Sequence, residues 1–545
     1  MFILDPTARI AAAAALRAIA VRASNQFSDG GSNNVWMRVV LPLAFMGRND
    51  KECESSFREV WDEGGQVANC SESALFAMSL EEKILPHLTK SLIEALNEVS
   101  WNRRVIACLS LNELCTKNIL TPTPKTGSLD SYSKDDLMQR DLIRSESSLR
   151  ILRSCLQLIL KSRVWDGKSD LVRAIATIAS KWTTFSFEDC SQQLNNEKAM
   201  LCPILFKHDF EWSELFVGDS WFSQRNNSHS IVLEDGGIED KMMTSISKLN
   251  DEDDSPTSLT ERNDLLEEDN DHESENDDYQ CDDAEVPMPA SISFAGLCRV
   301  LLEEGVSPES SKSKFYSNES LHYRAAALDS LSTLLKTKDN IQELDQLYMK
   351  MAPLLISTIT GYEEIYPCST AMESFDNIPP LIVARALGCI GSLIWKDMMY
   401  DNENIYTDVQ LLLQLFSKHC GETQAAWTVR EASAIAVSKL AQCSSSSIIT
   451  NLSFLENIME CSEILLMDKK FYKVRVAKLQ ILHCLCSRVD YSIEGIKLDE
   501  NQIVLEALLP LKEKIMKVAK IYLKDAEASV SALSSKIITK MAWWP

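Results

Sequence analysis

The chain has 545 residues, of which 45% are hydrophobic, and a formal net charge of −24. This length and apolar content allow a large core, whereas only 17 glycines and 16 prolines provide few turns, which favours long helices over a many-stranded sheet. No stretch reaches the roughly 18 uncharged apolar residues that a bilayer span needs, and the acidic balance argues against binding of nucleic-acid phosphates.

The first predicted element is an amphipathic helix over residues 5–24, with the sequence DPTARIAAAAALRAIAVRAS. Asp5 is suited to the N-cap and Pro6 to the first helical position. No helix precedes this one to cover its apolar stripe, so we expect it to be unpaired. We therefore expect the chain to be a fragment of a longer protein, with the missing partner helix upstream of Met1.

The position of Arg9, four residues after the cap, recurs in later apolar helices. The recurring residues are Arg104, Arg324, Arg385, Arg430 and Arg475, and the last three are spaced by 45 residues. A period of about 40–47 residues is typical of HEAT repeats. In such stacks we expect each arginine to bridge to an acidic group of a neighbouring repeat. Aromatic residues three positions earlier, which are Trp101, Trp427 and Tyr472, are expected to pack at the helix starts.

Helices of a second type, each with an early proline, alternate with the arginine-bearing helices. Their prolines are Pro42, Pro86, Pro353 and Pro510, and each should bend its helix by removing a hydrogen bond. The predicted pairs are 80–97 with 101–117, 145–161 with 168–182, 339–360 with 378–396, 405–419 with 425–442, 451–467 with 470–487, and 501–523 with 525–541. No pair has enough core to stand alone, so the predicted fold is all-α, a HEAT-type α-solenoid in which antiparallel helix pairs stack into a superhelix.

Two regions interrupt the predicted array. We expect HEAT-like repeats over 1–118, a loop over 119–144, one repeat over 145–185, an insert over 186–290 and further repeats over 291–545. The insert is expected to be partly ordered at first and then disordered, because residues 251–285 carry 17 acidic residues and one basic residue. This acidic run is either a solvated loop, or a segment that contacts a basic partner or masks a groove of the same protein.

Three motifs resemble ligand sites but favour structural roles. The GKS of Gly167–Ser169 lacks the upstream glycine and strand of a phosphate loop, so it is predicted to be an inter-helix turn. His483, Cys484 and Cys486 share one predicted helix and do not share a face, which disfavours a metal site. Cys190, Cys202 and His208 are spread too loosely to predict one.

The remaining sequence predicts neither an enzyme nor a cofactor. It contains no nucleophile elbow, no G-x-G-x-x-G and no H-E-x-x-H, so no catalytic, cofactor-binding or metal-ligating residue is assigned. The 16 cysteines include no C-x-x-C, and most lie in apolar helical stretches. This usage is typical of reduced, buried thiols in the cytosol or nucleus.

Three stretches of the first third of the chain resemble a known family. They are similar, in the same order, to the C-terminal region of large HEAT-repeat proteasome adaptor and scaffold proteins. The first is VVLPLAFMGRND followed by FREVWDEGG, the second is ILPHLTKSLIEALNEVSWNRRVIACLSLNEL, and the third is LRILRSCLQLILKSRVWDGKSDLVRAIATIAS. The resemblance covers about residues 1–182, and the long acidic insert departs from it. The best-matching residues are Leu41, Pro42, Leu43, Ala44, Phe45, Gly47, Val60, Trp61, Trp101, Trp165, Gly167 and Lys168.

The resemblance implies a non-catalytic scaffold that binds the proteasome in the cytoplasm and nucleus. Such proteins bridge the regulatory and core particles and support assembly or quality control. Two alternatives remain open: a karyopherin-type nuclear transport receptor, which also stacks HEAT repeats, and a cryptic enzyme built around residues 186–225.

Overall fold

The computed structural model describes most of the helical array and parts of its connections. The described residues are 6–22, 36–51, 54–67, 74–98, 100–122, 134–161, 167–190, 203–205, 215, 291–306, 318–337, 344–365, 378–394, 403–421, 426–444, 446–489 and 498–544.

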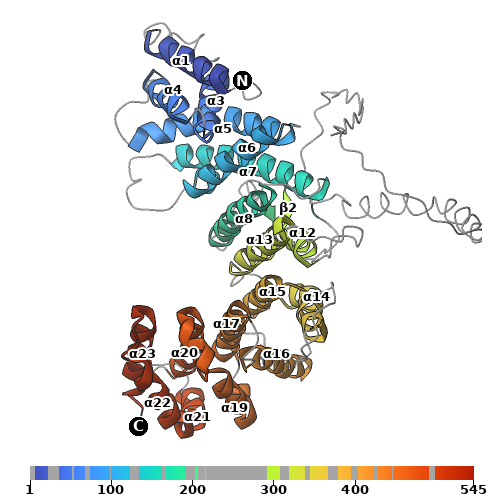
Figure 1. The fold of residues 1–545 in the computed structure, drawn as a ribbon, viewed down its shortest axis with the longest axis vertical. Helices are drawn as coiled ribbons and strands as arrows, with labels where there is room; N and C mark the ends of the chain where they lie inside the picture. Colours follow the sequence, from blue (N-terminus) through green and yellow to red (C-terminus); the bar gives the residue numbers. More distant parts are fainter. Residues whose placement is uncertain are drawn as a thin grey trace, which may run out of the picture.

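The fold is an all-α solenoid of stacked helix pairs, which confirms the predicted fold class (Figure 1). The first helices of the pairs, here called A helices, are α5 (Ala74–Asn97), α7 (Lys134–Lys161), α12 (Phe294–Val306), α14 (Leu344–Ile365), α16 (Glu403–Gly421), α19 (Leu452–Cys461) and α22 (Lys512–Tyr522). The second helices, here called B helices, are α6 (Trp101–Thr116), α8 (Lys168–Cys190), α13 (Asn318–Leu335), α15 (Pro380–Leu393), α17 (Trp427–Cys443), α20 (Tyr472–Ser487) and α23 (Ala528–Met541).

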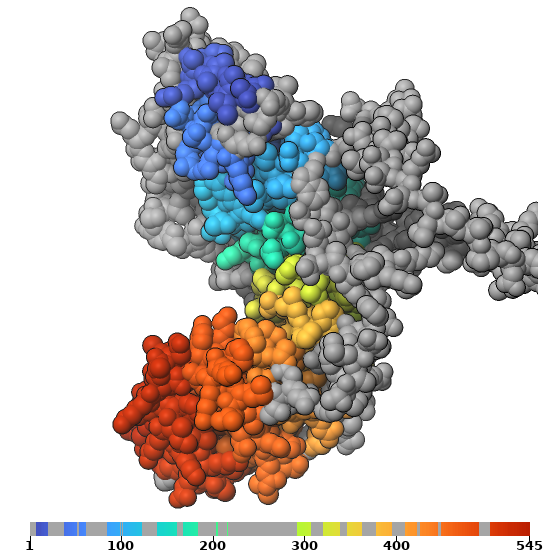
Figure 2. Space-filling model, viewed as in Figure 1, coloured from blue at the N-terminus to red at the C-terminus, as the bar shows by residue number. Residues whose placement is uncertain are grey.

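Each B helix packs against the next B helix along the chain. The apolar residues between the helices form one continuous buried cluster that extends from Leu41 to Trp544. The two termini therefore lie at opposite ends of the long axis, and the colours of Figure 2 follow one another along it from blue to red. Burial between neighbours supplies the stability that an isolated pair lacks.

The first helix, α1 (Pro6–Arg22), has a partner within the chain, so the expectation that it is unpaired is wrong. It packs against α4 (Glu54–Val67), which follows the short π-helix η1 (Trp36–Val40) and α3 (Leu41–Gly47). Ala13 of α1 is fully buried against Phe57 and Val60 of α4. The partner is downstream of α1 and is separated from it in the chain by η1 and α3.

The four prolines predicted to bend helices lie in different settings. Pro86 and Pro353 lie inside α5 and α14, as predicted. Pro42 instead lies in the first turn of α3, which follows directly on η1. Pro510 lies in a short 3-10 segment, η4 (Leu509–Leu511), which divides the predicted helix 501–523 into α21 (Leu498–Leu508) and α22.

The predicted loop over 119–144 is shorter than expected, because α7 already begins at Lys134. Its start is also fixed to the core. The carbonyl oxygen of Leu120 accepts hydrogen bonds from Ser148 Oγ at 2.8 Å and from Trp182 Nε1 at 2.9 Å. Composition alone did not reveal that side chains of α7 and α8 satisfy this turn; residues 123–133 lie outside the described residues.

The predicted insert begins later than expected, since α8 continues to Cys190. Its early part contains β1 (Ile204–Leu205), which pairs in parallel with β2 (Ile292–Ser293) directly before α12. Ser293 N also donates to Leu215 O at 2.8 Å, and both Ile204 and Leu215 are fully buried. This agrees with the order expected early in the insert, whereas the acidic run 251–285 lies outside the described residues.

A carboxylate fixes the turn after α3 to α6, and this contact should depend on pH. Glu113 accepts hydrogen bonds from Arg48 at 2.8 Å and Asn49 at 3.2 Å. Burial raises the pKa of Glu113, but the hydrogen bonds and charges of Lys117, Arg48 and Asn49 outweigh it, so the net pKa is lowered.

Because the pKa of Glu113 is lower in the folded state, its ionised form stabilises the fold. This contribution to the free energy of unfolding is fully present at pH values above the ordinary glutamate pKa, and it is lost as the pH falls through the pKa of the folded state. We therefore expect the protection of amides at the α3–α6 contact, which is the intrinsic exchange rate at each pH divided by the observed rate, to fall over this acidic range. Glu113→Gln should remove that pH dependence of the protection. An equal fall in the variant would show that another group controls the contact.

Candidate protein-binding groove

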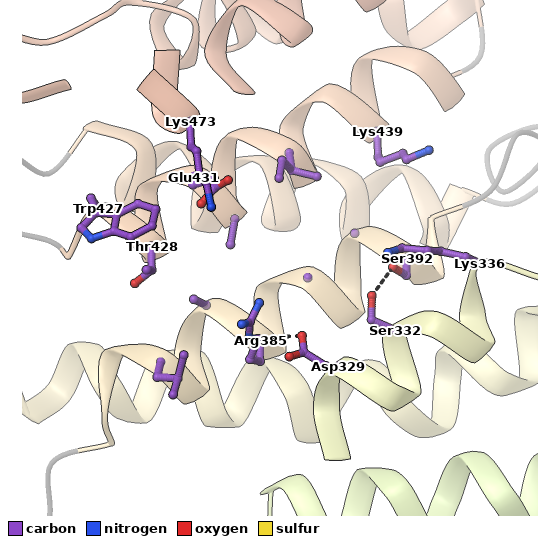
Figure 3. Close-up of a pocket in the computed structure, with 16 residues that line it drawn as sticks. Asp329, Ser332, Lys336, Arg385, Ser392, Trp427, Thr428, Glu431, Lys439 and Lys473 are labelled. Carbon is purple, nitrogen blue, oxygen red and sulfur yellow. Dashed lines mark hydrogen bonds and ion pairs between the residues drawn. The ribbon is translucent and has the colours of Figure 1, made fainter. Parts of the chain in front are cut away.

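The structure has a groove of about 500 Å³ between the B helices α13, α15, α17 and α20 (Figure 3). Its wall on one side comes from the end of α13 and from α15, and on the other side from α17 and the start of α20. Because four successive B helices contribute, the groove exists only in the stacked array.

Two glycines of α15 shape the floor of the groove. A Cβ on Gly391 would lie 3.3 Å from Cα of Ala436 in α17, so this glycine lets the two helices approach closely. A Cβ on Gly388 would meet nothing within 4 Å, so this glycine leaves a trough open to the groove. The opposite face of α15 carries the buried side chains Ile382, Leu387 and Ile390, which hold the helix in the core.

The two glycines should respond oppositely to substitution. Gly388→Ala adds a methyl group in open space within a helix and should stabilise the protein by about 0.5–1 kcal/mol. Gly391→Val must push α17 away and should destabilise it by about 1–3 kcal/mol. Thermal unfolding followed by circular dichroism would test this, and a gain from both substitutions would contradict the close approach at Gly391.

The charges of the groove are mostly positive. Lys336, Arg385, Lys439 and Lys473 face Asp329 and Glu431. Arg385 Nε lies 3.2 Å from Asp329 Oδ1, and both side chains are 44% exposed. Figure 3 shows this pair between the two ends of the groove, with Lys336 and Lys439 on opposite walls at one end.

The two carboxyl groups of the groove hold their protons more tightly than usual. Burial raises the pKa of Asp329, against the effect of Arg385, Arg173 and Lys336. Burial also raises the pKa of Glu431, against the effect of Lys473 and Arg385. Mild acid therefore neutralises these two groups before ordinary carboxylates, which makes the groove more positive.

The other end of the groove is built around Trp427, and the Lys473 ammonium lies 5.9 Å from the centre of its ring. Trp427 stacks on Phe471 at a centroid distance of 5.4 Å and an interplanar angle of 8°. This contact agrees with the packing role predicted for Trp427. Tyr472 is 41% exposed, and the side chain of Trp101 lies outside the described residues.

The recurring arginines do join successive repeats in the second half of the chain. Arg430 Nε lies 2.9 Å from Asp468 Oδ1, and Arg475 binds both carboxylate oxygens of Asp525 at 2.9 and 3.0 Å. Arg385 reaches Asp329 as described above.

The two earlier arginines contact main-chain carbonyl groups. Arg104 donates to the carbonyl oxygen of Glu98, and Arg324 donates to those of Gly305 at 3.1 Å and Val306 at 3.3 Å. These carbonyl groups lie at or just after the ends of α5 and α12, so both arginines satisfy the ends of the A helices of their own pairs.

The structure places Gly167–Ser169 at the turn predicted for them. Gly167 has φ of 94° and directly precedes α8. Lys168 is buried, with Nζ 3.8 Å from Glu304 and 4.6 Å from the centre of the Tyr323 ring. It therefore links α8 to α12 and α13.

The structure also places the other candidate ligand residues. His483, Cys484 and Cys486 lie in α20, where both cysteines are buried and burial raises the pKa of Cys486 to about 12. The side chain of Cys190 and all of Cys202 and His208 lie outside the described residues. Within the part of the chain that the structure describes, no cluster of three or more His, Cys, Asp or Glu side chains could hold a metal ion.

The sequence prediction did not identify the groove as a site. It gave Arg385 a structural role and did not single out Lys336, Lys439 or Lys473. The available signal was the pair Gly388 and Gly391 in a helix that otherwise has a continuous apolar face. Small residues at that spacing indicate either a close helix contact or a trough, and here they provide both.

The class of protein that this fold defines is a helical-repeat protein, an α-solenoid. Among the described helices, none has a segment both long and apolar enough to span a bilayer. No protein-family model matches the sequence, and no curated protein matches it either.

Solved structures match at low identity. A crystal structure of an engineered protein has 11% identity and a TM-score of 0.31, with 99% of this chain and 97% of that chain covered. A Kap121p mutant has 11% identity and a TM-score of 0.28, with coverages of 96% and 56%. A structure of Kap95p, described as binding RanGDP, has 8% identity and a TM-score of 0.24, with coverages of 97% and 66%.

The chain thus spans a little over half the length of that Kap121p chain. At these identities and scores, the assignment of the fold rests on the helix packing of the chain itself.

Proposed function

We propose that this protein is a non-catalytic scaffold of the cytoplasm and nucleus that binds the proteasome. In this role it would bridge the regulatory and core particles and support their assembly or quality control. The observation that carries the proposal is the resemblance of residues 1–182 to proteasome scaffolds, in a chain whose B helices pack side by side in one continuous row.

The resembling residues that the structure describes mostly build the core. Phe45 and Trp61 pack edge to face at 5.2 Å, and the Arg48 guanidinium lies over both rings. A Cβ on Gly47 would overlap the ring of Phe57. These matches support a shared local fold of α3 and α4.

Binding to purified particles tests the proposal directly. The full chain, carrying an affinity tag, would be mixed with purified core particle, regulatory particle or the assembled proteasome and then sedimented through a gradient. We expect it to sediment with the assembled proteasome and to increase the fraction of regulatory particle that remains bound to the core. No association with any of the three would overturn the proposal.

The same gradient distinguishes the transport-receptor alternative. A karyopherin-type function would give a stable complex with a small GTPase in its GTP form and none with the proteasome. A matched control replaces the tagged chain with the tag alone, so that sedimentation of free proteasome is measured under the same conditions.

A further inference from the structure

We propose that the groove between α13, α15, α17 and α20 binds a short extended peptide that is acidic at one end and apolar at the other. The inference rests on the protein-binding function proposed above and names the partner chemistry of one surface. It concerns a segment of a partner protein, and not a folded domain.

The dimensions of the groove suit a few residues in extended conformation. Its floor follows α15 from Leu381 to Ser392, a path of about 16 Å at the helical rise per residue. An extended strand covers that path with about five residues. The open space above Gly388 lets a peptide backbone approach the helix closely.

One end of the groove is built for carboxylates. Lys336, directly after α13, and Lys439 of α17 are both exposed and line this end of the groove from opposite sides (Figure 3). The hydroxyl groups of Ser332 and Ser392, 2.8 Å apart, lie beside Lys336. The chain has a net charge of −24, but four basic and two acidic side chains give the groove lining a positive net charge. This positive charge would attract acidic segments selectively.

The opposite end is built for an apolar side chain. Leu381 and Ala384 of α15 line it together with Trp427. The stacking of Trp427 on Phe471 fixes its orientation before any ligand arrives. A fixed aromatic surface loses little conformational freedom on binding, which is the property of an interface anchor.

Direct peptide binding tests this inference. The probe is a fluorescein-labelled peptide with one phenylalanine followed by four glutamates, and the comparison peptide has glutamines in their place. We expect fluorescence anisotropy to show binding of the acidic peptide that weakens strongly between about 0.1 M and about 1 M salt, because the Debye length falls from about 10 to about 3 Å.

Two independent variants place the binding in the groove. The double substitution Lys336→Glu and Lys439→Glu should weaken the acidic peptide by about tenfold or more. Its matched control, Lys350→Glu with Lys517→Glu, makes the same charge change at exposed positions of α14 and α22 outside the groove. Gly388→Leu should block the trough sterically, whereas Gly421→Leu, at another glycine with open space around it, should not.

The outcomes separate this inference from the proposed function. Equal binding of the glutamine peptide, equal losses in the control variants, or tighter binding of a short single-stranded oligonucleotide would overturn the acidic-peptide inference. The proteasome association of the unmodified chain would stand in those cases. Conversely, groove-dependent peptide binding by a chain that does not associate with the proteasome would retain the inference and overturn the proposed function.

Discussion

Replacing Asp468 with alanine is expected to destabilise the second half of the array by about 3–5 kcal/mol, because it leaves two buried cations without their carboxylate. Asp468 is fully buried and lies 2.9 Å from Arg430 and 2.8 Å from Lys478, whose side chains are 2% and 1% exposed. Its Oδ2 also accepts the backbone N–H of Leu465 at 3.0 Å. The residue lies in the 3-10 segment η3 (Leu466–Lys470), so it joins α17 to α20.

Local hydrogen exchange is the appropriate measurement for this variant, since a long repeat array does not unfold in one cooperative step. Amides of α17 and α20 whose exchange requires this region to unfold should exchange about a hundred- to several thousandfold faster in the variant. Asp329→Ala is the matched control, because it removes the same kind of inter-repeat contact with an arginine at an exposed site. It should cost no more than about 1 kcal/mol, and equal effects of the two substitutions would refute the role assigned to burial.

Trp182→Ala is expected to destabilise the first half by about 3–5 kcal/mol through loss of a large buried side chain. Trp182 is among the largest fully buried side chains and lies in α8. Its indole Nε1 donates at 2.9 Å to the carbonyl oxygen of Leu120, which ends the turn after α6. The substitution would therefore leave a cavity where α6, α7 and α8 meet.

Trp182→Phe separates the two contributions of this side chain. It keeps most of the volume and loses only the indole hydrogen bond, and Ser148 still donates to Leu120 O. The expected cost is about 1 kcal/mol. Hydrogen exchange of α6, α7 and α8 should be faster in the alanine variant than in the phenylalanine variant. A similar effect of both would mean that the hydrogen bond dominates over packing.

The sequence predicted the periodic part of this fold well, because burial of a helix face leaves a direct pattern in the residues. The spacing of Arg385, Arg430 and Arg475 correctly indicated stacked repeats, and the structure shows all three bound to aspartates of neighbouring repeats. Most helix boundaries followed from the apolar runs, whereas the predicted N-cap Asp5 lies outside the described residues. These features depend on residues near each other in the chain.

The errors share a different physical origin, since each involves a contact between distant residues. α1 is covered by α4 across an intervening segment, and the turn at Leu120 is satisfied by Trp182 and Ser148. α12, which pairs with α13, was not drawn as a repeat helix, because its sequence follows directly on the insert. Neither periodicity nor composition reports such contacts.

The groove was missed for the same reason. Lys336, Arg385, Lys439 and Lys473 come from four helices that are distant in sequence. In the sequence, each of these residues resembles an ordinary surface residue. Only the stacking of the B helices brings them to one surface. The sequence could have indicated the floor, through Gly388 and Gly391, but not the charges around it.

The parallel pairing of β1 with β2 has a consequence for how this chain can vary. Residues 203–205 and 291–293 are held side by side, and Leu215 is bonded to Ser293, so the two ends of the segment 216–290 are anchored at neighbouring points of the array. The free energy needed to close a loop rises only slowly with the length of the loop, by about 0.6 kcal/mol for each doubling. The segment 216–290 could therefore be lengthened, shortened or replaced while α8 and α13 remain packed against each other.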